Sequence, residues 1–261
     1  MPFSASRFPR ALLVSLGLIA LAAPCLLAGD TAVPASPAEI AAEKTTRATL
    51  EKALAADPQN LALRIQLGEV LSDLGAFGDK NASDAAVKLF ELLHQESPQD
   101  AVILADYGNA RTIYAQYASV FTQLNWVHGG FDDLDAAVKA APDNAGIRIT
   151  RALNSSQVPA FLKREQIARD DFAWLLARIH SRPQDFTADQ LRTIYFYDGH
   201  FALDHNDAAA VQLLDQAAAV PPPAGDTLAP KIADSLKIAH AKFPAAPAAP
   251  AASSPPVAKN S

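Results

Sequence analysis

Hydrophobic and small residues recur along this chain at helical spacing, in runs that each end at a proline. The first such run consists of Thr46, Leu50, Ala53 and Pro58, at spacings of four, three and five. The same spacings recur in two later runs: Ala86, Phe90, Leu93, Pro98 and Gly130, Leu134, Ala137, Pro142. Residues three and four apart share one face of an α-helix, and a helix ends near a proline. The pattern therefore predicts amphipathic helices that stop at or just before these prolines.

Nearly the same four letters surround four of the prolines. They read DPQN at 57–60, SPQD at 97–100, APDN at 141–144 and RPQD at 182–185, and Pro221 follows at a similar interval. The Asn or Asp that ends each of these four-residue segments can accept a hydrogen bond from an unpaired N–H of the next helix. A period of about 40 residues with a helix joint in every period predicts a stack of similar helix pairs.

On these residues the chain resembles the tetratricopeptide repeat family. Its unit is two antiparallel helices, with a large residue and a Gly in the first helix, a small–aromatic–small pattern in the second, and a Pro at the turn to the next unit. One unit matches through Leu67, Gly68, Ala86, Phe90 and Pro98, and the next through Tyr107, Gly108, Leu134, Ala137 and Pro142. A third matches loosely through Ala152, Ala168, Phe172 and Leu175, and a last one runs from Gly199 to the prolines at 221–223. The resemblance implies an all-α, right-handed α-α superhelix (a tetratricopeptide-like solenoid) of four to five helix pairs over about 36–243.

The units depart from the family pattern by being longer. The stretch from the first-helix Gly to the closing Pro runs from Gly68 to Pro98 in one unit and from Gly108 to Pro142 in the next, and both exceed the family's usual length. The extra residues are expected between the two helices of a unit, at 74–83, 116–131 and 154–165, where a stacked solenoid places its turns along one edge. A final amphipathic segment carries one apolar stripe and suits a capping helix: Leu228, Ile232, Leu236, Ala239, Phe243.

The two ends of the chain do not follow the helical pattern. Arg7 and Arg10 precede an apolar run from Ala11, which predicts an export signal cleaved after Ala28. A retained membrane anchor and lipid attachment at Cys25 are the alternatives. The domain boundaries that we predict are a signal peptide at 1–28, a linker at 29–35, the helical solenoid at 36–243 and a disordered Pro/Ala-rich tail at 244–261.

Charge and cysteine content limit the classes of function and the covalent links that we expect of this chain. The full chain has a net charge of -6, and loss of Arg7 and Arg10 leaves 20 basic against 28 acidic residues, a net charge of -8. Such a chain offers no basic surface for nucleic acid. Cleavage after Ala28 also removes Cys25, the single cysteine, so we expect no disulfide in the mature chain.

The sequence shows no recognised catalytic or metal motif. His200 and His205 lie close in sequence beside Asp198 and Asp204, but five positions on a helix turn the two imidazoles about 140° apart. The simpler interpretation is that one histidine faces the groove of the solenoid and the other lies at the end of its helix. Two acid pairs are expected to be first-turn acids that favour a helix N-terminus: Asp132–Asp133 and Asp170–Asp171. We therefore expect neither enzyme activity nor a metal or other cofactor.

Two surfaces are candidates for binding. The resemblance implies a concave wall lined by the first helix of each unit, with these polar candidates: Glu69, Ser72, Asn109, Thr112, His200. Asn109 stands where the family often contacts a peptide backbone, although an ordinary solvated Asn is an equal alternative. Ala105 stands where the family's carboxylate clamp has Lys, so a chaperone C-terminus is not the expected partner.

The second candidate surface is the edge formed by the enlarged turns. Its candidates are Phe77, Tyr117, Phe121, Trp126, His128 and Phe161. Aromatic side chains of this kind anchor protein interfaces. The alternative is that the inserted segments bury them as a second core, since Tyr114, Tyr117, Phe121 and Leu124 repeat at threes and fours.

These patterns predict an exported, non-catalytic adaptor for a protein or peptide in the bacterial cell envelope, in the periplasm or secreted. A small-molecule or lipid carrier is the first alternative, with a cavity closed by the inserted helices and lined by Phe121, Trp126 and Phe161. A metal-dependent enzyme using His128, His200 or His205 is the second.

Overall fold

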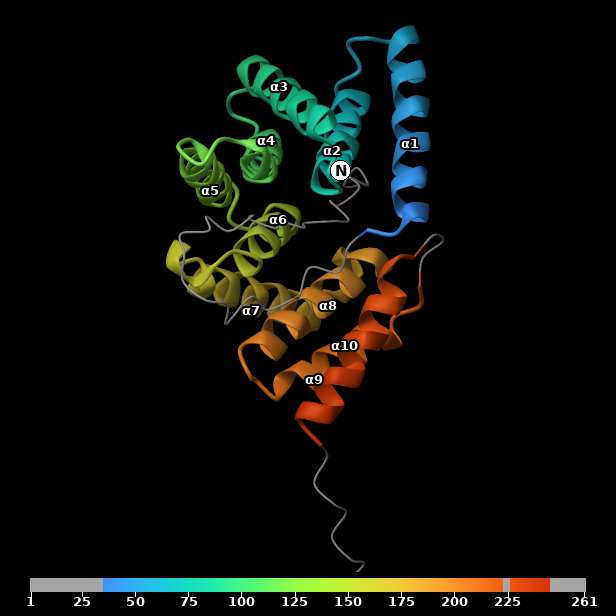
Figure 1. The fold of residues 1–261 in the computed structure, drawn as a ribbon, viewed down its shortest axis with the longest axis vertical. Helices are drawn as coiled ribbons and strands as arrows, with labels where there is room; N and C mark the ends of the chain where they lie inside the picture. The colour runs from blue at the N-terminus through green and yellow to red at the C-terminus, as the bar shows by residue number, and fades with distance from the viewer. Residues whose placement is uncertain (1–34, 223–225, 245–261) are drawn as a thin grey trace, which may run out of the picture.

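The computed structural model describes residues 35–222 and 226–244, and over these residues the fold is all-α (Figure 1). They contain ten α-helices, three 3-10 turns and no strand, so the expected all-α class is confirmed. The predicted signal peptide at 1–28 and most of the predicted tail lie outside the described residues. The α-helices are α1 (Pro37–Ala56), α2 (Leu61–Ala76), α3 (Lys80–Glu96), α4 (Ala101–Tyr114), α5 (Gln123–Ala140), α6 (Ala145–Ser156), α7 (Glu165–Ser181), α8 (Ala188–Asp204), α9 (Ala209–Ala219) and α10 (Leu228–Lys242).

The repeated four-letter joints begin three of the helices as predicted. The side chains of Asn60, Asp100 and Asn144 each accept a hydrogen bond of 3.2 Å from the backbone N–H three residues on. The fourth joint differs. Pro183–Asp185 forms a 3-10 turn, Phe186 continues in extended backbone and is buried, and α8 is capped by Thr187 instead. The prediction that the fourth joint's Asp caps its helix was therefore wrong, because the chain extends to bury Phe186 before α8 starts.

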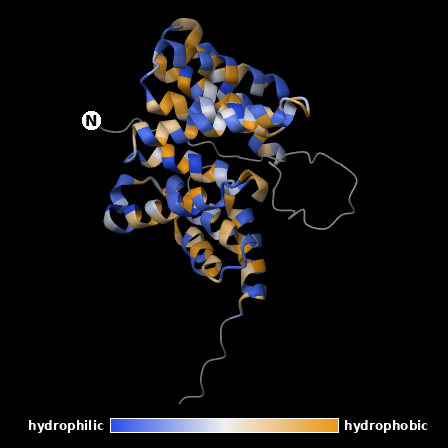
Figure 2. Cartoon of the chain, turned by 90° about the vertical axis from the view of Figure 1, so that its left-hand side faces the viewer, coloured by the Kyte–Doolittle hydropathy of each residue, from blue (hydrophilic) through white to orange (hydrophobic). Residues whose placement is uncertain are grey.

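The contacts join the helices in pairs and then in series. Within the described residues α2 packs on α3, α4 on α5, α6 on α7, and α8 on α9. The first helix of each pair also contacts the first helix of the next pair, from α2 to α4, α6 and α8. Helix α1 packs on α2 at one end of this series, and α10 packs on α8 and α9 at the other. Buried apolar side chains form the cores between the helices, and hydrophobic and hydrophilic residues are interspersed along the helices (Figure 2).

Glycines allow two of these pairs to approach closely. A Cβ on Gly108 would lie 2.7 Å from the carbonyl oxygen of Gly130, and one on Gly130 would lie 2.6 Å from that of Gly108. In the first pair a Cβ on Gly68 would lie 2.5 Å from the ring of Phe90. The α4–α5 crossing therefore requires a residue without a side chain on both helices.

The three enlarged turns take different forms. The first is short, because α2 continues to Ala76 and α3 starts at Lys80. The second continues as a 3-10 turn at Ala115–Tyr117 and then lengthens α5, which starts at Gln123. The third holds a 3-10 turn at Ala160–Leu162, and Val158 and Leu162 pack against a core that includes Val127 and Phe131 of α5. Ala115 of the second turn belongs to this same core, so the second and third turns share one apolar cluster.

The start of α1 reaches α10 near the other end of the chain (Figure 1). Glu39 forms an ion pair of 3.7 Å with Lys231 of α10, and both side chains are buried. Next to them Arg192 of α8 bonds Asp226 at 2.8 Å and also donates to Ala217 and Val220 at the end of α9. These contacts connect the first helix to the last pair.

Candidate functional site

Helices α4 and α6, the first helices of two consecutive pairs, are joined by a buried series of hydrogen bonds. Thr112 Oγ1 donates to Asn154 Oδ1 at 2.6 Å, and Asn154 Nδ2 donates to Asn109 Oδ1 at 3.0 Å. All three residues are buried. The structure thus brings the candidates Asn109 and Thr112 together, but their side chains bond Asn154, which the sequence analysis did not single out. The sequence contained one signal for Asn154, which is that it lies about one repeat after Asn109.

The other inner-wall candidates are also withdrawn from solvent. Glu69 and Ser72 are buried on α2. His200 on α8 is half-buried, lies parallel to the ring of Phe196 and approaches Ser235 Oγ of α10 at 3.4 Å. A groove ligand would therefore have to displace packed side chains, which makes this surface the weaker candidate.

Three candidates of the loop edge are held in packing contacts. Phe77 is half-buried against Ala76 and Ile113. The hydroxyl of Tyr117 donates to the carbonyl of Gly75. Trp126 is half-buried, with its ring edge-on to Tyr114 at 4.7 Å. These residues fix the enlarged turns onto the helices, as the second-core alternative proposes.

The remaining loop-edge candidates face solvent. Phe121 is 88 % exposed, Phe161 is 67 % exposed and His128 is exposed. Two apolar neighbours of Phe121 are also exposed, Val120 at 58 % and Leu124 at 40 %. We call Val120, Phe121, Leu124 and Phe161 the phenylalanine edge. The proposed burial of Phe121 in a second core is not what the structure shows, because the chain breaks its helix between Tyr117 and Gln123 and turns Phe121 outward.

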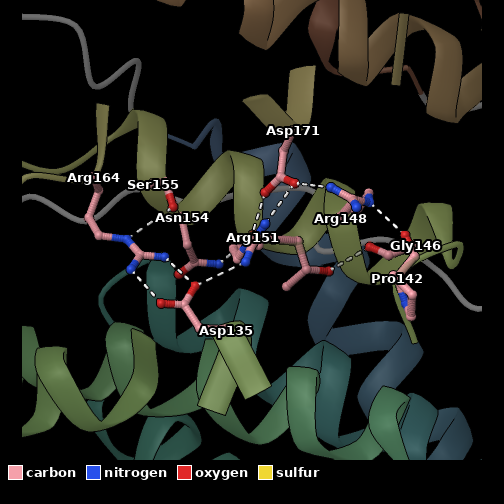
Figure 3. Close-up of polar contacts among 10 residues, drawn as sticks. Asp135, Pro142, Gly146, Arg148, Arg151, Asn154, Ser155, Arg164 and Asp171 are labelled. Carbon is pink, nitrogen blue, oxygen red and sulfur yellow. Dashed lines mark hydrogen bonds and ion pairs between the residues drawn. The ribbon is translucent and has the colours of Figure 1, made fainter. Parts of the chain in front are cut away.

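A network of arginines and aspartates joins α5, α6 and α7 (Figure 3). Asp171 of α7 is fully buried and accepts from Arg148 Nη1 at 2.7 Å and from Arg151 Nε at 2.7 Å. Asp135 of α5 accepts from Arg151 at 3.1 Å and from both terminal nitrogens of Arg164 at 2.8 Å. Burial raises the pKa of Asp135, but Arg164 and Arg151 outweigh it and lower that pKa below its ordinary value. The network is internally paired and holds helices together.

This network corrects one expectation. Asp170–Asp171 and Asp132–Asp133 were expected in first turns, but α7 starts at Glu165 and α5 at Gln123, so both pairs lie further along their helices. Asp133 bonds Arg111 at 2.6 Å, as Asp171 bonds its two arginines. One member of each pair thus links its helix to a neighbouring helix through an arginine, which periodicity alone does not reveal.

Two carboxyl groups have strongly raised pKa values. Burial, assisted by the charge of Asp100, raises the pKa of Asp106 to about 8. Burial and the charge of Asp207, opposed by Arg169, raise the pKa of Asp198 to about 6. Such groups are candidates for proton transfer. They lie on α4 and α8, and neither is among the charges that shift the pKa of the other, so they do not form an acid–base pair.

The histidines do not form a metal site within the described residues. His205 is the residue that ends α8, and its Nδ1 lies 2.8 Å from the carbonyl of Phe201, while His200 faces α10. No group of three or more His, Cys, Asp or Glu side chains in the described part of the chain is arranged to hold a metal ion. Among the same residues, no helix is long and apolar enough to cross a membrane.

Comparison of the chain with family models, curated proteins and solved structures gives no match.

Proposed function

We propose that this chain is a non-catalytic adaptor that binds another protein or a peptide in the bacterial cell envelope, and that its helices form a tetratricopeptide-like solenoid. The paired helices and the series α2, α4, α6 and α8 support the solenoid. Gly68 against Phe90 and Gly108 against Leu134 support it further, because these are the matched family positions.

The observation that carries the binding proposal is the exposure of the phenylalanine edge. Phe121 lies just before α5 and Phe161 in the turn after α6, and Val158 and Leu162 of that turn pack in the same core as Val127 and Phe131 of α5. Leaving a large apolar side chain in water costs about 1.5–3 kcal/mol relative to burying it. Val120, Phe121 and Leu124 are exposed within five residues of the chain. Exposed apolar patches mark interaction sites, and protruding phenyl rings fit an apolar groove on a partner protein.

The structure offers less support to the alternative of a small-molecule or lipid carrier with a closed cavity. A closed cavity lined by Phe121, Trp126 and Phe161 requires all three side chains to be covered, whereas Phe121 and Phe161 are exposed. The buried chain of Asn109, Asn154 and Thr112 also makes the inner wall a poorer binding surface than the edge. Export to the envelope rests on the apolar segment at 11–28, which lies outside the described residues.

The test is co-purification from the native cell envelope, with mass spectrometry of the retained proteins. We expect a partner protein at near-equal amount with the wild type and at least a tenfold loss in a Phe121→Ser, Phe161→Ser double variant, because anchor residues at an interface contribute about 2 kcal/mol or more. The melting temperature should change little, since both side chains are already exposed.

Ile238→Ser is the matched control, because Ile238 is an exposed apolar residue, at 55 %, on α10. It should retain the partner at the wild-type level. Equal retention by the double variant, or equal loss in the control, would contradict the proposed edge.

A further inference from the structure

An open pocket of about 480 Å³ lies between the start of α1 and the turn from α2 to α3. Its lining includes the half-buried apolar residues Ile40 and Phe77 and the polar residues Lys44, Lys80 and Asn81. Its volume is within the range of small-molecule sites, about 300–1,000 Å³. The adaptor proposal makes no use of this pocket.

The first enlarged turn builds the pocket. Gly78 has a φ of 102°, a value that L residues rarely adopt, and this lets the chain reverse directly after Phe77. Asp79 then caps α3 by accepting from the N–H of Ala82 at 3.0 Å. Lys80 and Asn81, at the start of α3, consequently line the pocket together with Lys44 of α1.

The charge of the pocket differs from that of the chain. The chain carries a net charge of -6, yet two lysines and one aspartate line this pocket. Both lysines are exposed and neither forms an ion pair within the described residues, while the Asp79 carboxylate bonds the start of α3. An anionic group in the pocket would therefore gain cationic neighbours, and an apolar group would contact Ile40 and Phe77.

We propose that this pocket binds an amphipathic carboxylate, with the alkyl chain against Ile40 and Phe77 and the carboxylate beside Lys44 and Lys80. A chain of about eight carbon atoms leaves space in a pocket of this volume. The site is separate from the phenylalanine edge, so the protein has one surface for a macromolecule and one for a small anionic ligand.

The test is calorimetric titration of the full chain with octanoate, and with octan-1-ol as the uncharged probe. We expect the wild type to bind octanoate about tenfold more tightly than octan-1-ol, because each exposed lysine contributes modestly to an ion pair. A Lys44→Ala, Lys80→Ala double variant should lose this tenfold preference and still bind octan-1-ol. Lys52→Ala, an exposed lysine further along α1 and outside the pocket, should bind both probes as the wild type does.

A second variant tests the apolar side. Phe77→Ala should weaken both probes by a similar factor, and Lys44→Gln, Lys80→Gln repeats the charge test if the alanine variant does not fold. Absence of octanoate binding up to about 10 mM, or equal binding by wild type and the charge variants, would overturn the proposal. The Phe121→Ser, Phe161→Ser variant should bind octanoate normally, so failure of the adaptor proposal and failure of this one are distinguishable.

Discussion

At the residue scale, Asp171 illustrates how a charge can be buried in this fold. Its carboxylate is fully buried and accepts hydrogen bonds from Arg148 and Arg151, which both lie on α6 (Figure 3). The guanidinium of Arg148 also lies 4.6 Å from the ring centre of Trp174 on α7. The two helices are therefore joined by ion pairs as well as by apolar packing.

Replacement of Asp171 by Asn should lower the free energy of unfolding by about 3–5 kcal/mol, because Arg148 loses its carboxylate partner and Arg151 keeps only Asp135. Urea unfolding measures this change. The control is Asp170→Asn at the adjacent exposed position, which bonds Gln166 on its own helix and should change stability by less than about 0.5 kcal/mol. Equal effects of the two variants would show that the network does not stabilise the α6–α7 pair.

At the element scale, the crossing of α4 and α5 depends on the absence of two side chains. Gly108 and Gly130 lie against each other's backbone, and Leu134 of α5 fills the space beside Gly108. Further along the crossing, Arg111 of α4 bonds Asp133 of α5. The close approach is thus a property of the pair and not of either helix.

Gly108→Ala should destabilise the protein by about 1–3 kcal/mol, because its Cβ would meet the Gly130 carbonyl at 2.7 Å and the two backbones would have to separate. The gain in helix propensity from Gly to Ala, about 1 kcal/mol, offsets part of this cost. Thermal unfolding measures the effect, with Asn125→Ala at an exposed position of α5 as the control. An unchanged or higher melting temperature for Gly108→Ala would mean that the crossing tolerates a methyl group.

At the scale of the whole molecule, the ion pair of Glu39 and Lys231 connects the first helix to the last. Burial raises the pKa of Glu39, but hydrogen bonds from Ser36 and Thr227 and the charge of Lys231 together lower it below its ordinary value. Because the pKa of Glu39 is lower in the folded state than in the unfolded state, this contact stabilises the folded protein at pH values above the ordinary pKa of a glutamate. The contribution is lost as the pH falls through the lowered value.

Lys231→Met should lower the free energy of unfolding by about 1–3 kcal/mol at neutral pH, because Glu39 is left as a buried charge without its cation. Amide hydrogen exchange should increase in the first turns of α1 while α4 and α5 keep their protection. Lys237→Met, at an exposed position of the same helix, is the control. Unchanged exchange in α1 would show that the two ends are held by other contacts. The double variant Glu39→Gln, Lys231→Met should recover part of the free energy of unfolding that Lys231→Met loses.

The sequence by itself determined the helices, most of their boundaries and the repeat, because these follow from local chemistry. Apolar spacing sets the buried face of each helix, and Asn60, Asp100 and Asn144 supply caps that are visible in the sequence. The exceptions were Thr187, whose role depends on the burial of Phe186, and the starts of α5 and α7, which lie earlier than their acid pairs predicted.

Only the tertiary structure decided which candidate side chains reach solvent and which charges meet. Phe121 and Trp126 are similar aromatic residues five positions apart, yet one is exposed and the other packs against Tyr114. The contacts of Asp171 with α6 and of Glu39 with Lys231 likewise join different helices, and the second of them joins the first helix to the last. Exposure and ion pairing depend on how the helices are placed in three dimensions, and this placement has no signature in the local pattern of the sequence.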